Sequence, residues 1–178
     1  MELALEDSSN DTVEVGWMVD QPQYGDSSPH LFVYHFSSGK TTCYNGCGFV
    51  QISKSNIPGE ALTAGSSVTY KIEFTNNEWQ IFFDGDELGY FPTSAYSDSF
   101  TAASLIQIYG EVATTGDLCI QMGNGTSGDQ PGSVDFSNFT LIGANSSPDL
   151  YPYQTESSSY SYGNPSATTL AIGGSGSC

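Results

Sequence analysis

Acid and amide side chains recur at alternating positions within apolar stretches of this 178-residue sequence. Glu14 and Gly16 alternate with Val13 and Val15, so a β-strand here would carry Glu14 on the face opposite the two valines. A carboxyl group beside an apolar surface suits general acid or general base chemistry. An ordinary solvent-facing sheet surface is the simpler interpretation of any one such residue.

The same alternation occurs elsewhere in the chain. In residues 105–112 the polar positions that share one predicted face are Gln107, Tyr109 and Glu111. Gln51 and Gln121 each stand between two aliphatic residues. If these faces belong to one sheet, the side chains would converge in a polar groove lined with aromatic residues.

The elements that would position these residues are strands. Short alternating runs separated by Gly, Pro, Asn and Asp dominate, which predicts an all-β sandwich or barrel. The clearest predicted strands are residues 13–19, 31–36, 49–52, 68–74, 79–84, 105–112 and 118–122. Asn76-Asn77 and Asp84-Gly85 are the best turn signals. We expect a single domain over residues 1–178, with residues 145–178 forming an irregular tail rich in Ser, Tyr, Pro and Gly.

The charge balance excludes some partners. Twenty acidic residues oppose three lysines, for a net charge of −17, so the chain cannot neutralise nucleic-acid phosphates and an anionic membrane would repel it. No apolar run is long enough for a spanning helix. Self-repulsion fades as carboxylates protonate, which suits a protein that works in acid.

Four cysteines predict two disulfides. Cys43 and Cys47 can pair only across a tight loop, which leaves Cys119 and Cys178 for each other and would tie the tail to the body. A zinc site is the alternative, but the chain lacks a second close-spaced pair of cysteines.

The cysteines indicate a secreted protein, although no signal peptide is present, so we expect a mature domain. Four glycosylation sequons agree with secretion: Asn10, Asn124, Asn138 and Asn145.

Other catalytic classes find little support. His30 and His35 are the only histidines, which leaves few candidates for a histidine-based triad. His35 stands between two aromatic residues, where a packed or a surface position explains it better than a role as a base. The acidic run 84–87 lacks the ligand spacing of an EF-hand, and a hairpin turn explains it better. We therefore expect carboxylate chemistry with no metal and no cofactor.

A series of short motifs spans most of residues 12–142, with a weaker continuation in the tail. In chain order they are Val13-Glu14-Val15-Gly16-Trp17, Tyr24-Gly25-Asp26, Leu31-Phe32-Val33-Tyr34, Cys43-Tyr44-Asn45, Cys47-Gly48-Phe49-Val50-Gln51, Leu88-Gly89-Tyr90-Phe91-Pro92, Tyr109-Gly110-Glu111-Val112 and Gln121-Met122-Gly123-Asn124-Gly125. In order and spacing they resemble the catalytic domain of the neprosin family.

That resemblance implies a function and a fold. The neprosin family comprises secreted glutamic peptidases that cut after proline in acid. The implied fold is a sandwich of two large antiparallel sheets, similar to jelly-roll and concanavalin-like folds, with the catalytic groove on the concave sheet. Carried over by motif, the catalytic pair is Glu14 and Glu111. The substrates would be proline-containing peptides or proteins, and we expect a monomer.

In the expected mechanism, one ionised glutamate activates a water molecule that attacks the scissile carbonyl, and its protonated partner stabilises the oxyanion and protonates the leaving amine. Gln51, Gln107 and Gln121 are candidate oxyanion donors. An aromatic pocket for a proline ring would come from Tyr90, Tyr109 and Trp17. Trp17, however, is two residues after Val15 and would share the face of Val13 and Val15, which favours packing in the core.

Two other classes fit the same composition and alternation. Glycoside hydrolases on jelly-roll sheets also use two glutamates in an aromatic groove. In a non-catalytic binding sandwich the glutamates would only hydrogen-bond a ligand. The ordered motifs favour the peptidase.

Overall fold

The computed structural model is built almost wholly of antiparallel strands and describes residues 1–116, 119–145, 147–156 and 158–177. The chain divides into two compact units, Met1–Ile108 and Tyr109–Cys178. The strands that begin in the first unit are β1 (Glu2–Glu6), β2 (Thr12–Met18), β3 (His30–Ser37), β4 (Lys40–Thr41), β5 (Val50–Gln51), β6 (Tyr70–Thr75), β7 (Glu78–Phe83), β8 (Asp86–Pro92) and β9 (Leu105–Tyr109). Two short helical turns are α1 (Gln21–Tyr24) and η1 (Thr93–Ala95).

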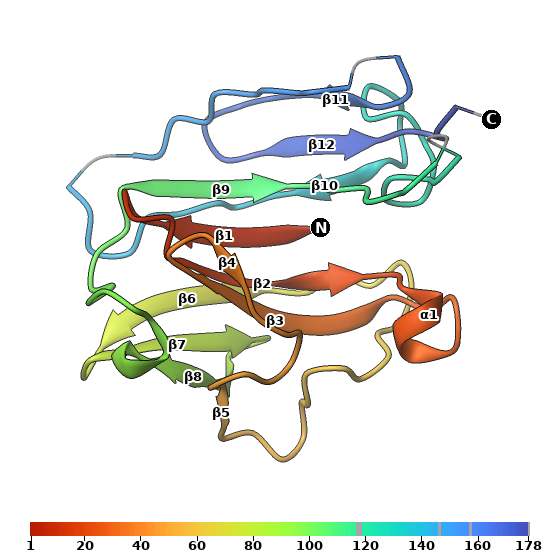
Figure 1. The fold of residues 1–178 in the computed structure, drawn as a ribbon. Coiled ribbons are helices and arrows are strands. Elements are labelled where there is room, and N and C mark those ends of the chain that lie inside the picture. Colours follow the sequence, from red (N-terminus) through yellow and green to blue (C-terminus); the bar gives the residue numbers. More distant parts are fainter. Residues whose placement is uncertain (117–118, 146, 157, 178) are drawn as a thin grey trace. The chain divides into compact units, whose positions relative to one another are not determined.

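The first unit is a sandwich of two sheets. One has the strand order β4-β3-β2-β1-β9 and the other β5-β8-β7-β6, and Figure 1 shows β6, β7 and β8 in a separate layer from β2 and β3. β7 alternates between half-buried and buried residues, whereas β2 and β3 are buried at consecutive positions, so the five-stranded sheet is covered on both faces along these two strands. The buried core consists of Val13, Val15, Leu31, Val33, Trp79, Ile81, Phe83, Leu88, Phe91, Tyr96 and Phe100. The predicted all-β sandwich is confirmed.

Two tight hairpins fix the register of the four-stranded sheet. Asn76 and Asn77 have φ values of 53° and 63°, and Asp84 and Gly85 have values of 49° and 87°. Positive φ at both central residues defines the type I′ turn, whose twist matches that of the flanking strands. Both predicted turns are therefore confirmed.

Of the two positions predicted for His35, packed or on the surface, the structure shows the packed one. It lies on the core face of β3, and its ring packs against Phe91 in a tilted arrangement with 4.6 Å between centroids. Burial lowers the pKa of the imidazole below its usual value, so the neutral form is favoured at this position.

The second unit contains a three-stranded sheet with the order β10-β12-β11. Its strands are β10 (Val134–Phe136), β11 (Ser161–Gly163) and β12 (Leu170–Gly173). The prediction of an irregular tail over residues 145–178 is therefore wrong for β11 and β12. The run Leu170-Ala171-Ile172 is buried at the centre of this sheet, and three apolar residues among serines and glycines are too weak a signal to reveal that.

Two predicted strands, residues 105–112 and 118–122, differ from the strands in the structure. β9 stops at Tyr109, three residues before the expected end at Val112. Of the predicted strand 118–122, Leu118 lies outside the described residues, and Met122 forms only an isolated bridge with Gly174.

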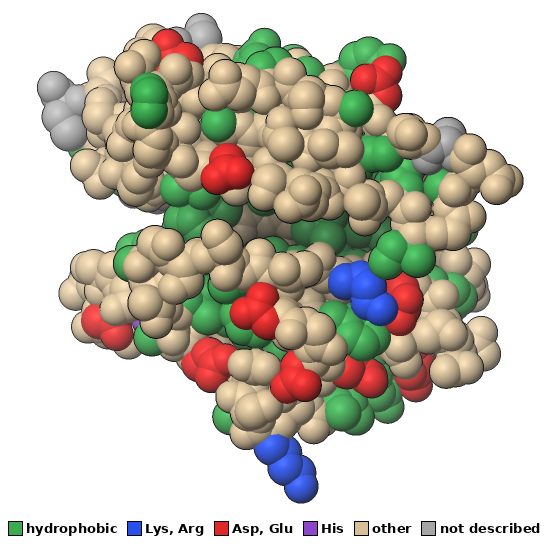
Figure 2. Space-filling model, turned by 180° about the vertical axis from the view of Figure 1, so that it is seen from behind, with side chains coloured by type: hydrophobic (Ala, Val, Ile, Leu, Met, Phe, Trp, Pro, Cys, Tyr) green, Lys and Arg blue, Asp and Glu red, His purple; other side chains and the backbone are tan. Residues whose placement is uncertain are grey.

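The surface matches the composition. Uncharged polar and backbone atoms cover most of the face in Figure 2, with acidic side chains scattered across it. Within the described ranges, no helix has the length and apolar character needed to cross a membrane.

Candidate active site

Glu14 lies at the middle of β2, on the side of the five-stranded sheet turned away from the core. Its cross-strand partners are Ala4 on β1 and Tyr34 on β3. We call this side the Glu14 face; by register its residues on β1, β2 and β3 are Glu2, Ala4, Glu6, Thr12, Glu14, Gly16, Met18, His30, Phe32, Tyr34 and Phe36. Glu14 is only 5% exposed, so its carboxyl group is a buried acid rather than a member of a solvated sheet surface.

An aromatic cluster adjoins Glu14. Tyr34 packs against Phe36 with centroids 5.0 Å apart, and against Tyr44 at 4.5 Å. Tyr44 also meets Phe32 edge-on at 5.5 Å and remains 40% exposed. The cluster gives Glu14 an apolar neighbourhood with a partly open surface, which suits a flat apolar ring.

The predicted disulfide between Cys43 and Cys47 is confirmed, with Cα atoms 5.6 Å apart, and Tyr44 lies in the loop that it closes. Asn45 lies between the two cysteines. Its backbone N–H donates to the Val33 carbonyl at 2.9 Å, and its side-chain oxygen accepts from the Val33 N–H at 3.0 Å. The small loop is thereby fastened to the free edge of β3. Because both thiols are oxidised, these two cysteines are not zinc ligands.

The second predicted disulfide stays a prediction. The sulfur of Cys119 lies 3.6 Å from the carbonyl oxygen of Ser177, the residue before Cys178. Cys178 itself lies outside the described residues.

His30 sits at one end of the Glu14 face and binds two acceptors. Its Nδ1 lies 2.8 Å from the Gly59 carbonyl and its Nε2 3.0 Å from Asp26 Oδ1. The ring stacks on Tyr24 at 4.0 Å, nearly parallel. The hydrogen bond to Gly59, followed by that to Asp26, raises the pKa of His30, and the same contact with His30 lowers the pKa of Asp26. With both ring nitrogens facing acceptors, the imidazolium form is favoured.

This contact predicts a pH-dependent part of the stability. A raised native pKa stabilises the fold fully below the unfolded value of about 6.5, and that contribution is lost as pH rises through the native value. On the acid side, the lowered pKa of Asp26 keeps that carboxylate ionised. We expect urea unfolding to show wild type more stable than His30→Gln at about pH 5.5, with a smaller difference at about pH 8.5. A difference that is constant across this range would contradict the assignment.

Several predicted substrate-contact residues lie away from the Glu14 face. Tyr90 pairs with Val50 and Gln80 on the outer side of the four-stranded sheet, so both sheets separate it from Glu14. Gln51 is an exposed edge residue whose amide nitrogen donates to the Ser53 carbonyl at 2.9 Å. Trp17 is half-buried on the valine side of β2, as parity predicts. The structure does not bring these three residues to Glu14.

The other predicted residues lie on or after β9. Gln107 is exposed, Tyr109 is half-buried at the end of the strand, and Glu111 is exposed two residues beyond it. The side-chain amide of Gln121 lies against Gly125 in the glycine-rich loop. Glu14 belongs to the first unit and Glu111 to the second.

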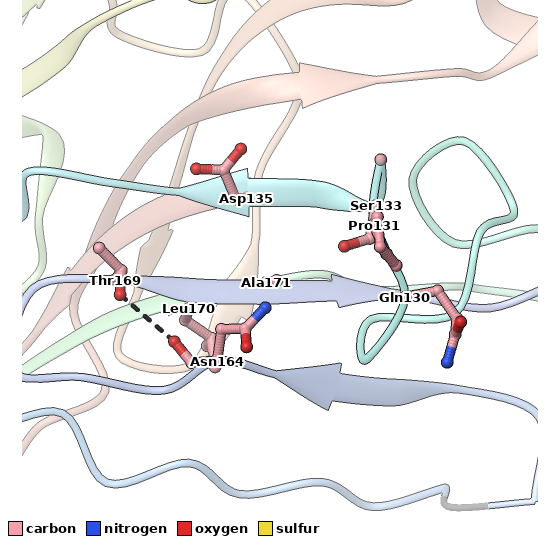
Figure 3. Close-up of a pocket in the computed structure, with 9 residues that line it drawn as sticks. Gln130, Pro131, Ser133, Asp135, Asn164, Thr169, Leu170 and Ala171 are labelled. Carbon is pink, nitrogen blue, oxygen red and sulfur yellow. Dashed lines mark hydrogen bonds between the residues drawn. The ribbon is translucent and has the colours of Figure 1, made fainter.

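A separate hollow of about 250 Å³ lies within the second unit. Figure 3 shows it beside β10 and β12, where Thr169 Oγ1 donates to the carbonyl of Asn164 at 3.3 Å. Asp135 is its one carboxylate, so its lining can bind polar groups but has no pair of acids for hydrolysis.

The sequence does not reveal that Tyr34 pairs with Glu14, that Tyr44 packs on Tyr34, or that Glu2 lies on the same face. The alternation of His30, Phe32, Tyr34 and Phe36 was a usable signal for the aromatic face. No local pattern indicates which strand lies beside β2.

Together, the fold and the site define an all-β sandwich with a buried carboxyl group beside a partly open aromatic surface. The Neprosin family model matches residues 1–174, and the chain belongs to the Neprosin family. This is a peptidase family, which places the protein among the hydrolases.

Proposed function

We propose that the protein is a secreted glutamic endopeptidase that hydrolyses peptide bonds after proline in acid, with Glu14 and Glu111 as its catalytic residues. The observation that supports this most is the burial of Glu14 beside the aromatic cluster, in a chain of a peptidase family. Burial disfavours the ionised form of a carboxyl group, so a site of this kind can hold one acid protonated while another is ionised.

The reaction needs these two protonation states and one water molecule. The ionised glutamate removes a proton from water as the water oxygen bonds to the scissile carbonyl carbon. The protonated glutamate donates a hydrogen bond to the carbonyl oxygen as it becomes negative, then transfers its proton to the leaving nitrogen as the C–N bond breaks. Gln107 and Gln121 remain candidate oxyanion donors.

The aromatic cluster offers a basis for the proline preference. A pyrrolidine ring is apolar and a proline residue has no backbone N–H to satisfy, so it gains most from contact with an apolar surface. Tyr44 is half-open while Tyr34 and Phe32 are buried behind it. We assign recognition of the proline ring to this cluster.

The proposed setting is extracellular and acidic, with a monomeric enzyme acting on peptides or proteins. The Cys43–Cys47 disulfide supports an oxidising compartment. The net charge of −17 is reduced as pH falls, which lowers self-repulsion in acid. The four sequons would carry glycan in that compartment.

The test is hydrolysis of a quenched peptide with one proline, from about pH 3 to about pH 8, beside the same peptide with alanine in place of proline. We expect cleavage that peaks in acid and strongly favours the proline peptide. Equal cleavage of both peptides would overturn the proline preference. If the folded protein cleaves neither peptide, the peptidase assignment fails, and turnover of a polysaccharide would then favour a glycosidase.

A further inference from the structure

A second buried acid lies on the Glu14 face. Glu2, on β1, is 7% exposed, which is unusual for a glutamate. Its cross-strand partner is Gly16, two residues along β2 from Glu14 and on the same side of the sheet. Two acids thus lie on one buried surface within the same unit.

Gly16 lets β1 approach β2 closely at Glu2. A Cβ on residue 16 would lie 2.2 Å from the Met1 carbonyl oxygen and 2.8 Å from both Cα and Cβ of Glu2. Glu2 therefore fills the place that a side chain at position 16 would take. Backbone hydrogen bonds between Met1 and Trp17 hold this end of β1 at 3.0 and 2.9 Å.

The spacing follows from strand geometry. Glu2 and Glu14 are diagonal neighbours on adjacent antiparallel strands, and residues in this relation lie about 7 to 8 Å apart. At that separation in a partly dehydrated site, two negative charges repel by more than RT. The Glu14 face carries no lysine, and the cation adjacent to Glu2 in the chain is the α-ammonium of Met1, which donates to the Trp17 carbonyl at 3.0 Å.

The other titratable groups around Glu14 differ from Glu2: each is more exposed, is hydrogen-bonded to another residue, or lies on the core side of the sheet. On the same face, Glu6 is half-exposed, His30 is engaged with Asp26, and the hydroxyl of Tyr34 accepts from the Thr42 N–H. From the core side, Asp11 and Tyr96 are buried. Tyr96 has a raised pKa, caused first by its burial and then by the charges of Asp11 and Glu14.

We propose that Glu2 is a positioning residue for Glu14: it occupies the space left by Gly16 and, when ionised, makes Glu14 keep its proton to higher pH. The two acids then titrate as a coupled pair. The catalytic part of this inference rests on the proposed function, whereas the coupling itself does not.

NMR titration of the glutamate carboxyl carbons tests the coupling without any activity. In the wild-type protein, the chemical shifts of Glu2 and of Glu14 should each change in two steps, one for each protonation of the pair. This part of the test uses the wild-type protein alone and does not depend on the folding of a variant. Removing the charge in Glu2→Gln should lower the titration midpoint of Glu14 by about one pH unit. Glu6→Gln, on the same strand and face, is the matched control and should shift it by much less. The proposal would be overturned if Glu2 and Glu14 each titrate in one independent step in the wild-type protein. It would also be overturned if Glu2→Gln and Glu6→Gln shift the titration midpoint of Glu14 equally.

The pH profile of kcat/KM tests the consequence for catalysis. One side of the pH profile has its midpoint set by the titration of Glu14: the acid side if Glu14 is the base, and the alkaline side if it is the acid. In either case this midpoint should move to lower pH in Glu2→Gln and return toward the wild-type position in Glu2→Asp. A reduced rate with both sides of the profile unmoved would show a purely structural role and overturn the proposal. A wild-type protein without peptidase activity would refute the proposed function, and the NMR titration would still decide the coupling.

Discussion

Glu14→Gln is expected to lower kcat/KM for peptide hydrolysis by about 10³-fold, within the range of about 10² to 10⁴ that general acid–base groups supply. Glutamine has nearly the same shape as glutamate but can neither accept nor deliver a proton at the reacting atoms. The variant should keep its fold, because the amide can still make hydrogen bonds at this buried position. Steady-state kinetics at the acid optimum, with circular dichroism of each variant, makes the comparison.

Glu111→Gln should cause a loss of similar size, and the double variant should be little worse than either single one, because both residues serve one chemical step. Glu73→Gln is the matched control, since Glu73 lies on β6 in the other sheet, paired with Lys71 at 2.8 Å. Its activity should stay close to wild type. If both folded single variants keep near-normal activity, the two-glutamate mechanism is refuted.

Trp79→Ala should lower the free energy of unfolding by about 3 to 5 kcal/mol, a large share of the usual total of about 5 to 15 kcal/mol. Trp79 is 3% exposed in the core between the two sheets. Its ring packs on Phe100 at 4.4 Å and Phe74 at 5.0 Å, and its indole N–H donates to the Phe100 carbonyl at 2.9 Å. Alanine would leave a cavity and a buried carbonyl without its donor.

Phe82→Ala is the control for that measurement, because Phe82 lies on the same strand but on the outer side of its sheet. It is half-buried, with the Lys71 ammonium 3.7 Å from its ring centroid. An exposed cation–π contact contributes about 0.5 to 1 kcal/mol, so the loss should be much smaller than for Trp79. Equal losses in urea unfolding would contradict the assignment of the inner and outer faces.

The features that the sequence predicts correctly are those fixed by neighbouring residues. The alternation of Val13 and Val15 with Glu14 reflects the two-residue period of a strand, whatever lies beside it. Asn76-Asn77 and Asp84-Gly85 predict their turns because these residue types tolerate positive φ. The Cys43–Cys47 disulfide is similarly local, since a loop this short leaves few other arrangements.

The composition of the site depends on contacts that are distant in the chain. Parity assigns a residue to one of two sides of its strand, but a sandwich of two sheets has four faces. Tyr90 and Gln51 alternate as correctly as Glu14 does, yet they belong to the other sheet. Parity alone could not separate these cases.

The sequence by itself determined the strands β2, β3, β5, β6, β7 and β9, the two turns, the Cys43–Cys47 disulfide and the family, whereas the burial of Glu14 came from the structure. Only the tertiary structure placed β1 beside β2, set Glu2 over Gly16, and brought Tyr44 against Tyr34. The reason is physical: the backbone period and turn conformations are set by adjacent residues, whereas the neighbours of a strand are chosen by the burial and hydrogen bonding of the whole chain.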